Sequence, residues 1–279
     1  MIIKIITTLY CLIVKTLIRF GFMASIFLRK RIFKTEIILV ACMPKSGSTY
    51  VSGKIANLKN WKHVDFVPSY GQREQEICAY TALFKSLVYI NRNIVAQHHV
   101  RLSDGTARVV NRLGIKVIIL TRDIEDCLNS IVDHMHNESY IFPAGFWSKE
   151  LSDASIANGI SEFEAIVRTN IGWYVNFYVS WSQYGTFDIN TDAVAVKYEE
   201  FFENPTKNLK QILDELNISY SIPNIQDTIN AQTKDRKNKG IHGIGHEKLE
   251  SNTQLKEHIE CLYSCYPGIN FHSKIKINT

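Results

Sequence analysis

The sequence lacks the features that divide chains of this length into several units. It has only 14 glycines and 6 prolines among 279 residues, and no stretch rich in proline, glycine and serine forms a linker. It also has no internal repeat. A chain of this length can bury about three-quarters of its unfolded surface in one core. We therefore expect a single domain over residues 35–279, preceded by an apolar and basic segment over residues 1–34.

Cysteine is sparse and scattered. Of the six cysteines, only Cys261 and Cys265 lie close together on a predicted helix, and no second pair completes a metal site. Several of the others sit in apolar patterns, as small core residues do. We expect no metal site from these residues, and we expect free thiols in a reducing, cytoplasmic compartment. A structural disulfide is the alternative.

The sequence also lacks an excess of positive charge beyond its first residues. Seven basic residues precede Glu36, the first acid: Lys4, Lys15, Arg19, Arg29, Lys30, Arg31 and Lys34. Without these seven, the 32 basic residues fall to 25 against 27 acidic ones, so the domain carries about two negative charges. A general nucleic-acid-binding surface has the opposite sign. We therefore expect no nucleic-acid partner.

Residues 1–34 are apolar, with one polar stripe. The stripe follows from helical spacing and contains Lys4, Thr8, Cys11, Lys15 and Arg19. The free energy of inserting this helix across a membrane is close to zero at best. The apolar residues contribute a favourable ~3–6 kcal/mol, whereas the two central charges cost about 5–7 kcal/mol. A cleaved signal would carry no such charges. We expect peripheral membrane contact by an interfacial helix, helped by residues 29–31, with packing on the domain as the alternative.

Residues 36–50, EIILVACMPKSGSTY, indicate a strand, a phosphate-binding loop and the start of a helix. Six residues that suit a buried strand end at Met43. The small residues that follow turn successive N–H groups into one concavity at a helix N-terminus, where the helix dipole favours an anion. Hydroxyl groups and one lysine add donors and charge. The predicted anion-binding residues are Pro44, Lys45, Ser46, Gly47, Ser48 and Thr49.

The loop differs from the common nucleotide-binding loop, GxxxxGK[ST]. In that loop the lysine follows the last glycine, whereas Lys45 precedes Gly47. No glycine lies four to six residues upstream of Gly47. The spacing therefore weakens an interpretation as an ATP or GTP site, and an ordinary strand-to-helix turn is a further alternative.

The rest of the chain alternates short apolar strands with helices. Continuous apolar runs predict strands over residues 37–42, 94–97, 115–120 and 193–196. Such runs suggest burial on both faces, as in a parallel sheet that helices cover. We predict an α/β fold of three layers, with a mostly parallel central sheet of the P-loop nucleotide-binding type. Ligands of such sheets gather at the carboxyl ends of the strands, where Lys45, His99 and Arg122 would meet.

Apolar spacing also predicts the helices. Their expected ranges are residues 51–58, 72–88, 107–113, 162–181, 205–216 and 247–266. Gly114 suits a C-terminal cap for the third of these, and Pro205 suits the first turn of the fifth. Residues 63–70 read as a loop.

A second anion site is indicated after the clearest strand. Arg122 ends that strand, and Ser130 lies eight residues further on, about two turns into the next helix. Both can face the carboxyl end of the strand, and a guanidinium fork with a hydroxyl suits a phosphate. A salt bridge between Arg122 and Asp123, Glu125 or Asp126 is the alternative.

Four motifs together resemble those of the sulfotransferases that use 3′-phosphoadenosine-5′-phosphosulfate (PAPS). They are PKSGSTY, LTRDIEDCLNS, VKYEEFFENP and the late basic loop with NKG, and they extend from residue 36 to about residue 245. The first two are fairly specific as a pair. The resemblance implies in-line transfer of a sulfuryl group from PAPS to a hydroxyl or amine of an acceptor. It also implies adenosine 3′,5′-bisphosphate as a product and no need for a metal.

The resemblance implies roles for the two anion sites. The loop from Pro44 to Thr49 would hold the 5′-phosphosulfate. Lys45 would contact the bridging oxygen, where charge develops on the leaving group. Arg122 and Ser130 would hold the 3′-phosphate.

The resemblance also implies residues around the adenine and the late loop. Tyr50 and Tyr198 match positions that line the adenine site. Lys239 and Gly240 match the tail of the loop that covers the 3′-phosphate. Asn238 stands where the family has Arg or Lys, so this last match is incomplete.

Sulfuryl transfer is helped by a base that removes the proton of the acceptor. His99 is the leading candidate, because it follows a strand and lies 23 residues before Arg122, which is similar to where many family members place a catalytic histidine. If the strand continues, His98 points to the opposite side. Some family members use a carboxylate, and Glu74 or Glu76 is then the candidate.

Other functions and the acceptor stay open. A P-loop kinase that uses Mg-ATP is the alternative function, with Asp123 as the nearest match to a Mg²⁺ ligand, and a binding protein without turnover is the third. The acceptor is a hydroxyl-bearing molecule, with a carbohydrate or glycolipid as the class named, although phenols and lipids also suit an aromatic pocket. Residues 58–70 and 137–157 are expected to line that pocket. Its aromatic candidates are Phe66, Tyr140, Phe142, Phe146 and Trp147. Nothing in the sequence indicates an oligomeric state.

Overall fold

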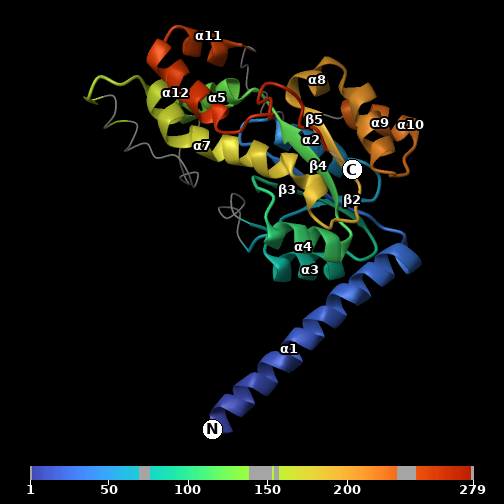
Figure 1. Cartoon of the computed structure of the whole chain (residues 1–279). Coiled ribbons are helices and arrows are strands. Elements are labelled where there is room, and N and C mark those ends of the chain that lie inside the picture. Colours follow the sequence, from blue (N-terminus) through green and yellow to red (C-terminus); the bar gives the residue numbers. More distant parts are fainter. Residues whose placement is uncertain (1, 69–75, 138–152, 154–156, 231–242, 278–279) are drawn as a thin grey trace.

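The computed structural model describes residues 2–68, 76–137, 153, 157–230 and 243–277. Within these residues, five parallel strands form one sheet in the order β2-β3-β1-β4-β5. The strands are β1 (Ile37–Cys42), β2 (Trp61–Val64), β3 (Asn93–His98), β4 (Lys116–Thr121) and β5 (Ala193–Lys197). Helices cover both faces of the sheet (Figure 1). The predicted three-layer α/β fold with a parallel central sheet is confirmed.

Each central strand faces two hydrophobic cores, which explains why its apolar run is continuous. In β1, Ile38 and Val40 face one core and Leu39 faces the other, and all three are fully buried. A strand covered on both faces has no polar side. The first core includes residues of α2 (Ser48–Ala56), α8 (Tyr198–Glu203), α9 (Pro205–Glu215) and α10 (Ile222–Asn230). The second includes residues of α3 (Ala79–Val88), α4 (Asp104–Leu113), α5 (Ile124–Asn137) and α7 (Glu162–Ser182).

The carboxyl ends of the central strands lie along one edge of the sheet. The register places Ala41 opposite His98, and Thr121 opposite Lys197. β1 has β3 on one side and β4 on the other, so the strand order reverses at β1. In open parallel sheets a ligand crevice forms at such a point, outside the carboxyl ends of the strands. The loops after these strands therefore border one region.

Two of the predicted segment boundaries are wrong near the β2 edge of the sheet. Residues 63 and 64, expected in a loop, belong to β2, a four-residue edge strand that pairs only with β3. Only its first and last residues, Trp61 and Val64, are buried, so the strand gives no continuous apolar run. The helix expected from residue 72 begins at Ala79, because Cys78 is extended, and residues 72–75 lie outside the described part.

The last predicted helix, over residues 247–266, is two helices. α11 (Ile244–Glu250) and α12 (Thr253–Ser264) are separated by Asn252, whose side chain accepts a hydrogen bond from the N–H of Leu255 at 3.1 Å. Asn favours such a capping position over a helix interior. The helix predicted over residues 107–113 is confirmed within α4, and Gly114 closes it in the left-handed conformation (φ 61°).

The cysteines of the described chain contribute to packing. Cys42 and Cys127 are fully buried, each in one of the two cores. Burial raises the pKa of the Cys127 thiol, which keeps this thiol protonated. The described cysteine side chains are free thiols: Cys42, Cys78, Cys127, Cys261 and Cys265.

α1 (Ile2–Phe27) and the π-helical turn η1 (Leu28–Phe33) form a rod that projects from the body (Figure 1). Arg29 attaches this rod, because its buried guanidinium donates hydrogen bonds to the carbonyl oxygens of Ser86, Tyr89 and Arg92. These carbonyl groups lie at and beyond the end of α3, where a helix leaves acceptors unused. Among the described helices, none combines the length and the apolar character that crossing a membrane requires.

Candidate functional site

Two residues of the loop after β1 adopt the left-handed backbone conformation before α2 begins. Lys45 (φ 64°) and Gly47 (φ 75°) adopt this conformation, and Ser46 between them donates a hydrogen bond from Oγ to the carbonyl oxygen of Met43 (2.6 Å). α2 starts directly after Gly47, so its first N–H groups, which have no acceptor within the helix, border the loop. Residues 44–49 thus form a loop and a helix start at the carboxyl end of β1, a combination that attracts anions.

Arg122 joins this loop to the end of β4. It is 6% exposed, and its Nη1 donates a hydrogen bond to the carbonyl oxygen of Lys45 at 3.0 Å. A guanidinium carries five N–H donors in a planar fork, so this bond uses one of them. The structure therefore brings together two of the residues that the sequence placed at the carboxyl ends of their strands.

Tyr198, the first residue of α8, packs against both Gly47 and Arg122. A Cβ atom on Gly47 would lie 2.6 Å from two carbons of the Tyr198 ring. The Cζ atom of Arg122 lies 4.5 Å from the centre of the same ring, which is a cation–π distance. Gly47, Arg122 and Tyr198, which follow β1, β4 and β5 respectively, are thus brought together by the ring of Tyr198.

Phe202 lies between the two tyrosines that were predicted to line the adenine site. The ring centres of Tyr50 and Phe202 are 4.9 Å apart, and those of Tyr198 and Phe202 are 4.3 Å apart. None of the sequence motifs singled out Phe202 as a site residue. The sequence feature that could have identified Phe202 is its position four residues after Tyr198, which places both rings on one face of α8. Ser130, the predicted partner of Arg122, is buried on α5.

Gln97 is a second residue that the sequence analysis missed. It is a buried polar residue in the apolar strand β3. Its Nε2 donates to Ser48 Oγ (2.8 Å), and its Oε1 accepts from Ser52 Oγ (3.3 Å). A serine hydroxyl that accepts a hydrogen bond directs its own hydrogen elsewhere. The signal for Gln97 is an amide side chain that directly follows the apolar run IVA within the strand NIVAQH.

The two histidines at the end of β3 have different surroundings. His98 is fully buried, its Nε2 accepts a hydrogen bond from the N–H of Phe66 (2.9 Å), and its ring stacks on Phe66. His99 follows the strand and is half-buried. Because neighbouring side chains alternate in an extended chain, His99 falls on the side of Gln97, which faces α2.

Several predicted residues have other positions than expected or lie outside the described residues. Phe66, expected in the acceptor pocket, is fully buried in the core against His98. Glu76 is exposed, and its Oε2 would lie 2.6 Å from a Cβ atom on Gly105, beside the start of α4. The predicted residues outside the described part of the chain are Glu74, Tyr140, Phe142, Phe146, Trp147, Lys239 and Gly240.

Three acidic residues meet beside Arg122. Asp123, Asp126 and Glu199 each offer a carboxylate oxygen, and these oxygens lie within 4.8 Å of one another. Lys197 Nζ lies 2.8 Å from Asp123, and the N–H of Asp123 donates to Glu199 (3.3 Å). Burial raises the pKa of Glu199. The cluster thus ties the turn after β4 to the turn after β5.

Asp126 also attaches the start of α11 to α5. Its two carboxylate oxygens accept hydrogen bonds from the N–H groups of Gly243 (2.9 Å) and Gly245 (3.0 Å). A Cβ atom on Gly245 would overlap the backbone of Glu125. Donors of the chain itself therefore occupy both oxygens of this carboxylate, and we assign Asp126 a structural role.

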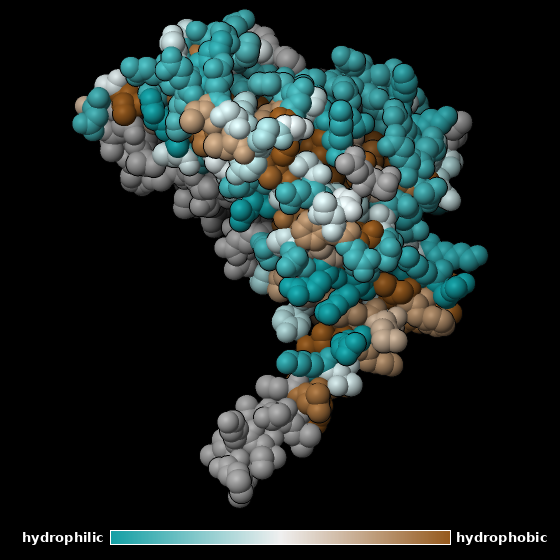
Figure 2. All heavy atoms as spheres, viewed as in Figure 1, coloured by the Kyte–Doolittle hydropathy of each residue, from teal (hydrophilic) through white to brown (hydrophobic). Residues whose placement is uncertain are grey.

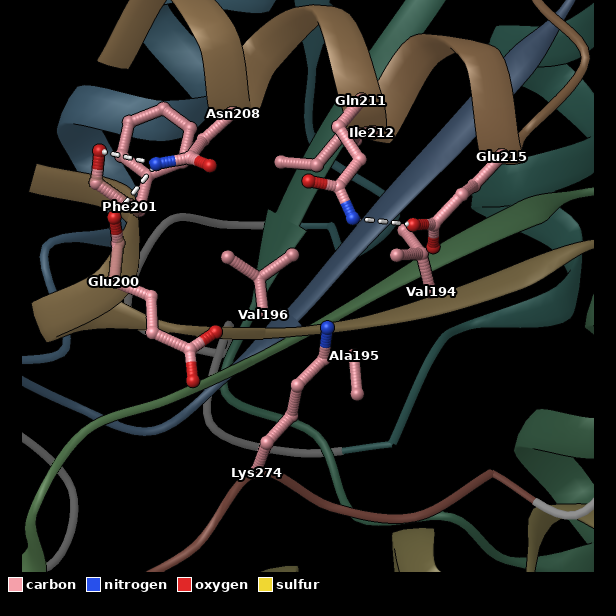
Figure 3. A pocket seen from close by; sticks show the side chains of 10 residues that line it. All are labelled: Val194, Ala195, Val196, Glu200, Phe201, Asn208, Gln211, Ile212, Glu215 and Lys274. Atoms are coloured by element: carbon pink, nitrogen blue, oxygen red, sulfur yellow. Dashed lines mark hydrogen bonds between the residues drawn. The ribbon is translucent and has the colours of Figure 1, made fainter. Parts of the chain in front are cut away.

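A small cavity lies between β5 and α9 (Figure 3). Its volume is about 50 Å³, whereas pockets for organic ligands measure about 300 Å³ or more. Figure 3 shows Lys274 reaching toward Ala195, and Gln211 bonded to Glu215. None of the predicted anion-binding residues lines this cavity, so we give the strand ends priority as the candidate site.

Comparisons with known proteins identify the family of the chain. A family model, described as the sulfotransferase domain, matches residues 35–259. The fold is similar to that of mouse sulfotransferase SULT7A1 complexed with PAP, with a TM-score of 0.55 and 16% identity, covering 85% of this chain and 86% of that chain. At this identity the likeness shows the fold alone.

Two further solved structures are more distant. A sulfotransferase from Alicyclobacillus acidocaldarius is 12% identical, with a TM-score of 0.44 and coverage of 81% of this chain and 95% of that chain. Retinol dehydratase in a complex with retinol and PAP is 14% identical, with a TM-score of 0.48 and coverage of 84% and 82%. No curated protein matches the sequence.

Proposed function

The chain belongs to the sulfotransferase domain family, and we propose that it transfers a sulfuryl group from PAPS to a hydroxyl or amine of an acceptor. The hydrogen bond from Arg122 Nη1 to the carbonyl oxygen of Lys45 carries the proposal. It couples the loop after β1 to the turn after β4, which are the two segments that the sequence assigns to the two phosphate-bearing ends of PAPS. A donor with a separate 3′-phosphate needs two such anion sites side by side.

In the proposed complex, the 5′-phosphosulfate lies against the loop of residues 44–49. N–H groups at the start of α2 and the loop hydroxyls donate to its oxygens, and Lys45 supplies a full charge. Gly47 has no side chain, so the backbone can approach the anion closely. The 3′-phosphate is held by Arg122 and Ser130 through charge-assisted hydrogen bonds.

The adenine is placed beside the aromatic residues of α2 and α8. Tyr50, Tyr198 and Phe202 form a group of ring contacts with centroid distances of 4.9 and 4.3 Å. Their ring edges and faces suit stacking with a planar base. We also propose that Lys239 and Gly240, in the late basic loop, cover the 3′-phosphate.

The transfer itself is a displacement at sulfur. The acceptor oxygen forms a bond to sulfur while the bond between sulfur and the bridging phosphate oxygen breaks. Negative charge develops on that bridging oxygen, where Lys45 stabilises it. The acceptor proton passes to the imidazole of His99. His98 is less suited to this step, because its Nε2 already accepts a backbone hydrogen bond, and Glu76 or Glu74 is the carboxylate alternative.

The acceptor in this proposal is a hydroxyl-bearing molecule, with a carbohydrate or glycolipid as the class we favour. A screen with radiolabelled PAPS against glycans, glycolipids and small phenols tests it directly. Label transfer to one class identifies the acceptor. Transfer to phenols alone would overturn the carbohydrate assignment while leaving the sulfotransferase proposal intact.

Nucleotide binding separates the sulfotransferase proposal from a kinase that uses Mg-ATP. The cluster of Asp123, Asp126 and Glu199 is the one observation that favours a kinase, yet Lys197 and two backbone N–H groups engage it. We expect adenosine 3′,5′-bisphosphate to raise the melting temperature in the presence of EDTA. At a hundredfold excess over Kd, such a ligand stabilises the native state by about 2.7 kcal/mol. Stabilisation by Mg-ATP alone would favour the kinase.

A further inference from the structure

The exposed large apolar side chains of the described chain are confined to one end of the molecule. All twelve of them lie on α1, η1 and α3. They include Phe20 (68% exposed) on α1 and Phe84 (61% exposed) on α3. Isolated exposed apolar residues are normal on soluble proteins, but a concentration of them marks an interaction surface. Figure 2 shows brown side chains where the α1 rod meets the body.

α1 is apolar on two opposite faces. Phe22 and Ser25 face the body, where Phe22 is in the core and Ser25 bonds to Ser86 on α3. Ile13, Phe20 and Phe27 recur every seven residues, so they share the opposite face, and all three are exposed. Packing on the body accounts for the first face only. The second face, which we term the outer face of α1, needs another apolar partner.

Arg29 holds the outer face in a defined direction. Its Nη2 donates to the carbonyl oxygens of Ser86 and Tyr89 (both 2.9 Å), and its Nη1 donates to that of Arg92 (3.0 Å). Burial lowers the pKa of Arg29 to about 10, so the guanidinium stays charged at neutral pH and keeps these bonds. α1 and α3 are therefore held together at one end of the protein (Figure 1). Their exposed apolar residues consequently belong to that end.

Basic residues outnumber acidic ones at this end, where the exposed acids are Glu76 and Asp104 at the start of α4. α1, η1 and α3 contain no acidic residue. Exposed basic residues lie on or beside these elements and on the neighbouring α4: Lys15, Arg19, Lys30, Arg31, Lys34, Arg92, Arg108 and Arg112. An apolar surface with a basic border is the combination that binds anionic lipids. Two copies of the chain placed face to face would oppose like charges.

We propose that the outer face of α1 and the exposed face of α3 dock together on an anionic lipid surface. Tyr80, Phe84 and the apolar residues of α1 enter the interface, and the basic residues contact the lipid head groups. Thus α3, a part of the folded domain, binds lipid together with the N-terminal segment. β1 begins just after η1 and ends at the donor loop, so about six residues at ~3.3 Å each separate the two sites by ~20 Å. The donor loop therefore stays open to water when the protein is docked.

Co-sedimentation of the full chain with lipid vesicles tests the proposal. We expect binding to vesicles of phosphatidylcholine with about one-third phosphatidylserine to exceed binding to pure phosphatidylcholine by at least ~10-fold. Phe20→Glu and Phe84→Glu should each reduce binding by ~10-fold or more, because each places a negative charge in the apolar contact. Phe20→Leu keeps an apolar side chain and should bind as the original chain does.

A charge-matched pair of variants separates the basic border from net charge. Lys30→Glu with Arg31→Glu should lose binding to anionic vesicles, whereas Lys207→Glu with Lys210→Glu, an equal charge change on exposed residues of α9, should retain it. Melting curves by circular dichroism establish that each variant is folded. Unchanged binding by folded Phe84→Glu would overturn the role of α3. A dimer in the absence of lipid that Phe20→Glu dissociates would overturn the lipid proposal in favour of self-association.

Discussion

The side-chain amide of Gln97 donates a hydrogen bond to the hydroxyl of Ser48 across 2.8 Å. Gln97 lies near the end of β3, and Ser48 begins α2 at the donor loop. The oxygen of the same amide, Oε1, accepts a hydrogen bond from Ser52 Oγ, one turn later in α2 (3.3 Å). This second bond fixes which way the amide of Gln97 points. Because Ser48 Oγ accepts from Gln97, its own hydrogen is available to an anion in the loop.

Gln97→Leu and Gln97→Glu test this arrangement. Leu removes both hydrogen bonds of the amide and leaves the Ser48 hydroxyl without a fixed orientation. That orientation is worth about one hydrogen bond of 0.5–1.5 kcal/mol to a bound anion, so we expect adenosine 3′,5′-bisphosphate to bind up to ~10-fold more weakly. Glu accepts from Ser48, turns its hydrogen away from the loop and adds a negative charge, so the loss should exceed that of Leu. Titration calorimetry measures both constants. Ser52→Ala removes the bond that fixes the direction of the amide but leaves the bond to Ser48, so binding should weaken less than in Gln97→Leu. A Glu variant that binds as tightly as the original chain contradicts the arrangement.

Substitution of Lys45 and of Arg122 should affect different kinetic parameters. Lys45→Ala removes charge stabilisation that we assign to the leaving group, so we expect kcat to fall by ~100-fold or more while the Kd of adenosine 3′,5′-bisphosphate changes little. Arg122→Ala removes a charge-assisted hydrogen bond of about 1.5–3 kcal/mol, so that Kd should rise ~10-fold or more. Arg122→Lys keeps the charge without the fork and should be intermediate. If neither alanine variant changes sulfuryl transfer, both assignments are wrong.

The adjacent histidines should separate catalysis from stability. His99→Ala should lower kcat by ~100-fold, as expected for loss of a general base, with an unchanged melting temperature. His98→Ala leaves the buried N–H of Phe66 without its acceptor, which costs about 1–3 kcal/mol of stability. Thermal unfolding and initial rates on the same samples measure both effects. Near-normal turnover of His99→Ala would transfer the role to Glu76 or Glu74.

The sequence alone was sufficient for the parts of the fold that depend on local patterns. β1 spans the predicted residues, β4 is shifted by one residue at each end, and β5 is longer by one residue, because strands covered on both faces are continuous apolar runs. β2 escaped prediction because an edge strand of four residues has too short a pattern to separate from a loop. Its pairing with β3 depends on contacts distant in sequence.

The candidate site was predictable to the extent that its residues occur in contiguous motifs. Lys45 and Arg122 were expected at one edge of the sheet because both follow buried strands. Gln97 and Phe202 were missed, since their importance depends on partners 49 residues away for Gln97 and on ring packing for Phe202. The apolar surface of α1 was visible in the sequence, and its membrane contact stays a prediction. The exposed apolar residues of α3 were not expected beside it, because that placement depends on contacts distant in sequence, such as those of Arg29 with Ser86 and Tyr89.

Glu199 should make stability depend on pH. Burial raises its pKa above the ordinary value of 4.5, so the folded state holds this proton more tightly than the unfolded state does. Stability therefore falls as pH rises from about 4.5 through the raised pKa. Glu199→Gln stays neutral and retains an acceptor for the N–H of Asp123, so its stability should fall less over this range. Urea unfolding at a series of pH values upward from about 4.5 measures the difference. Glu200→Gln, at an exposed neighbour, should leave the profile unchanged.

Gly47→Ala tests the contact between the donor loop and α8. Gly47 has a φ of 75°, and a Cβ atom there would lie 2.6 Å from the ring of Tyr198. A left-handed alanine costs about 1–2 kcal/mol, and the overlap adds to this unless the ring moves away from the loop and from Arg122. We expect lower stability and at least ~10-fold weaker binding of adenosine 3′,5′-bisphosphate, measured by urea unfolding and calorimetry. Gly172→Ala is the control, because no atom lies within 4 Å of its added carbon, and in the helix α7 this change should stabilise by about 1 kcal/mol. A double variant separates the overlap from the backbone strain. Gly47→Ala combined with Tyr198→Ala removes the overlap with the ring but keeps the strain of a left-handed alanine at position 47. Its loss of stability should therefore be smaller than the sum of the two single losses, and strictly additive losses would show that the ring does not rest on the loop.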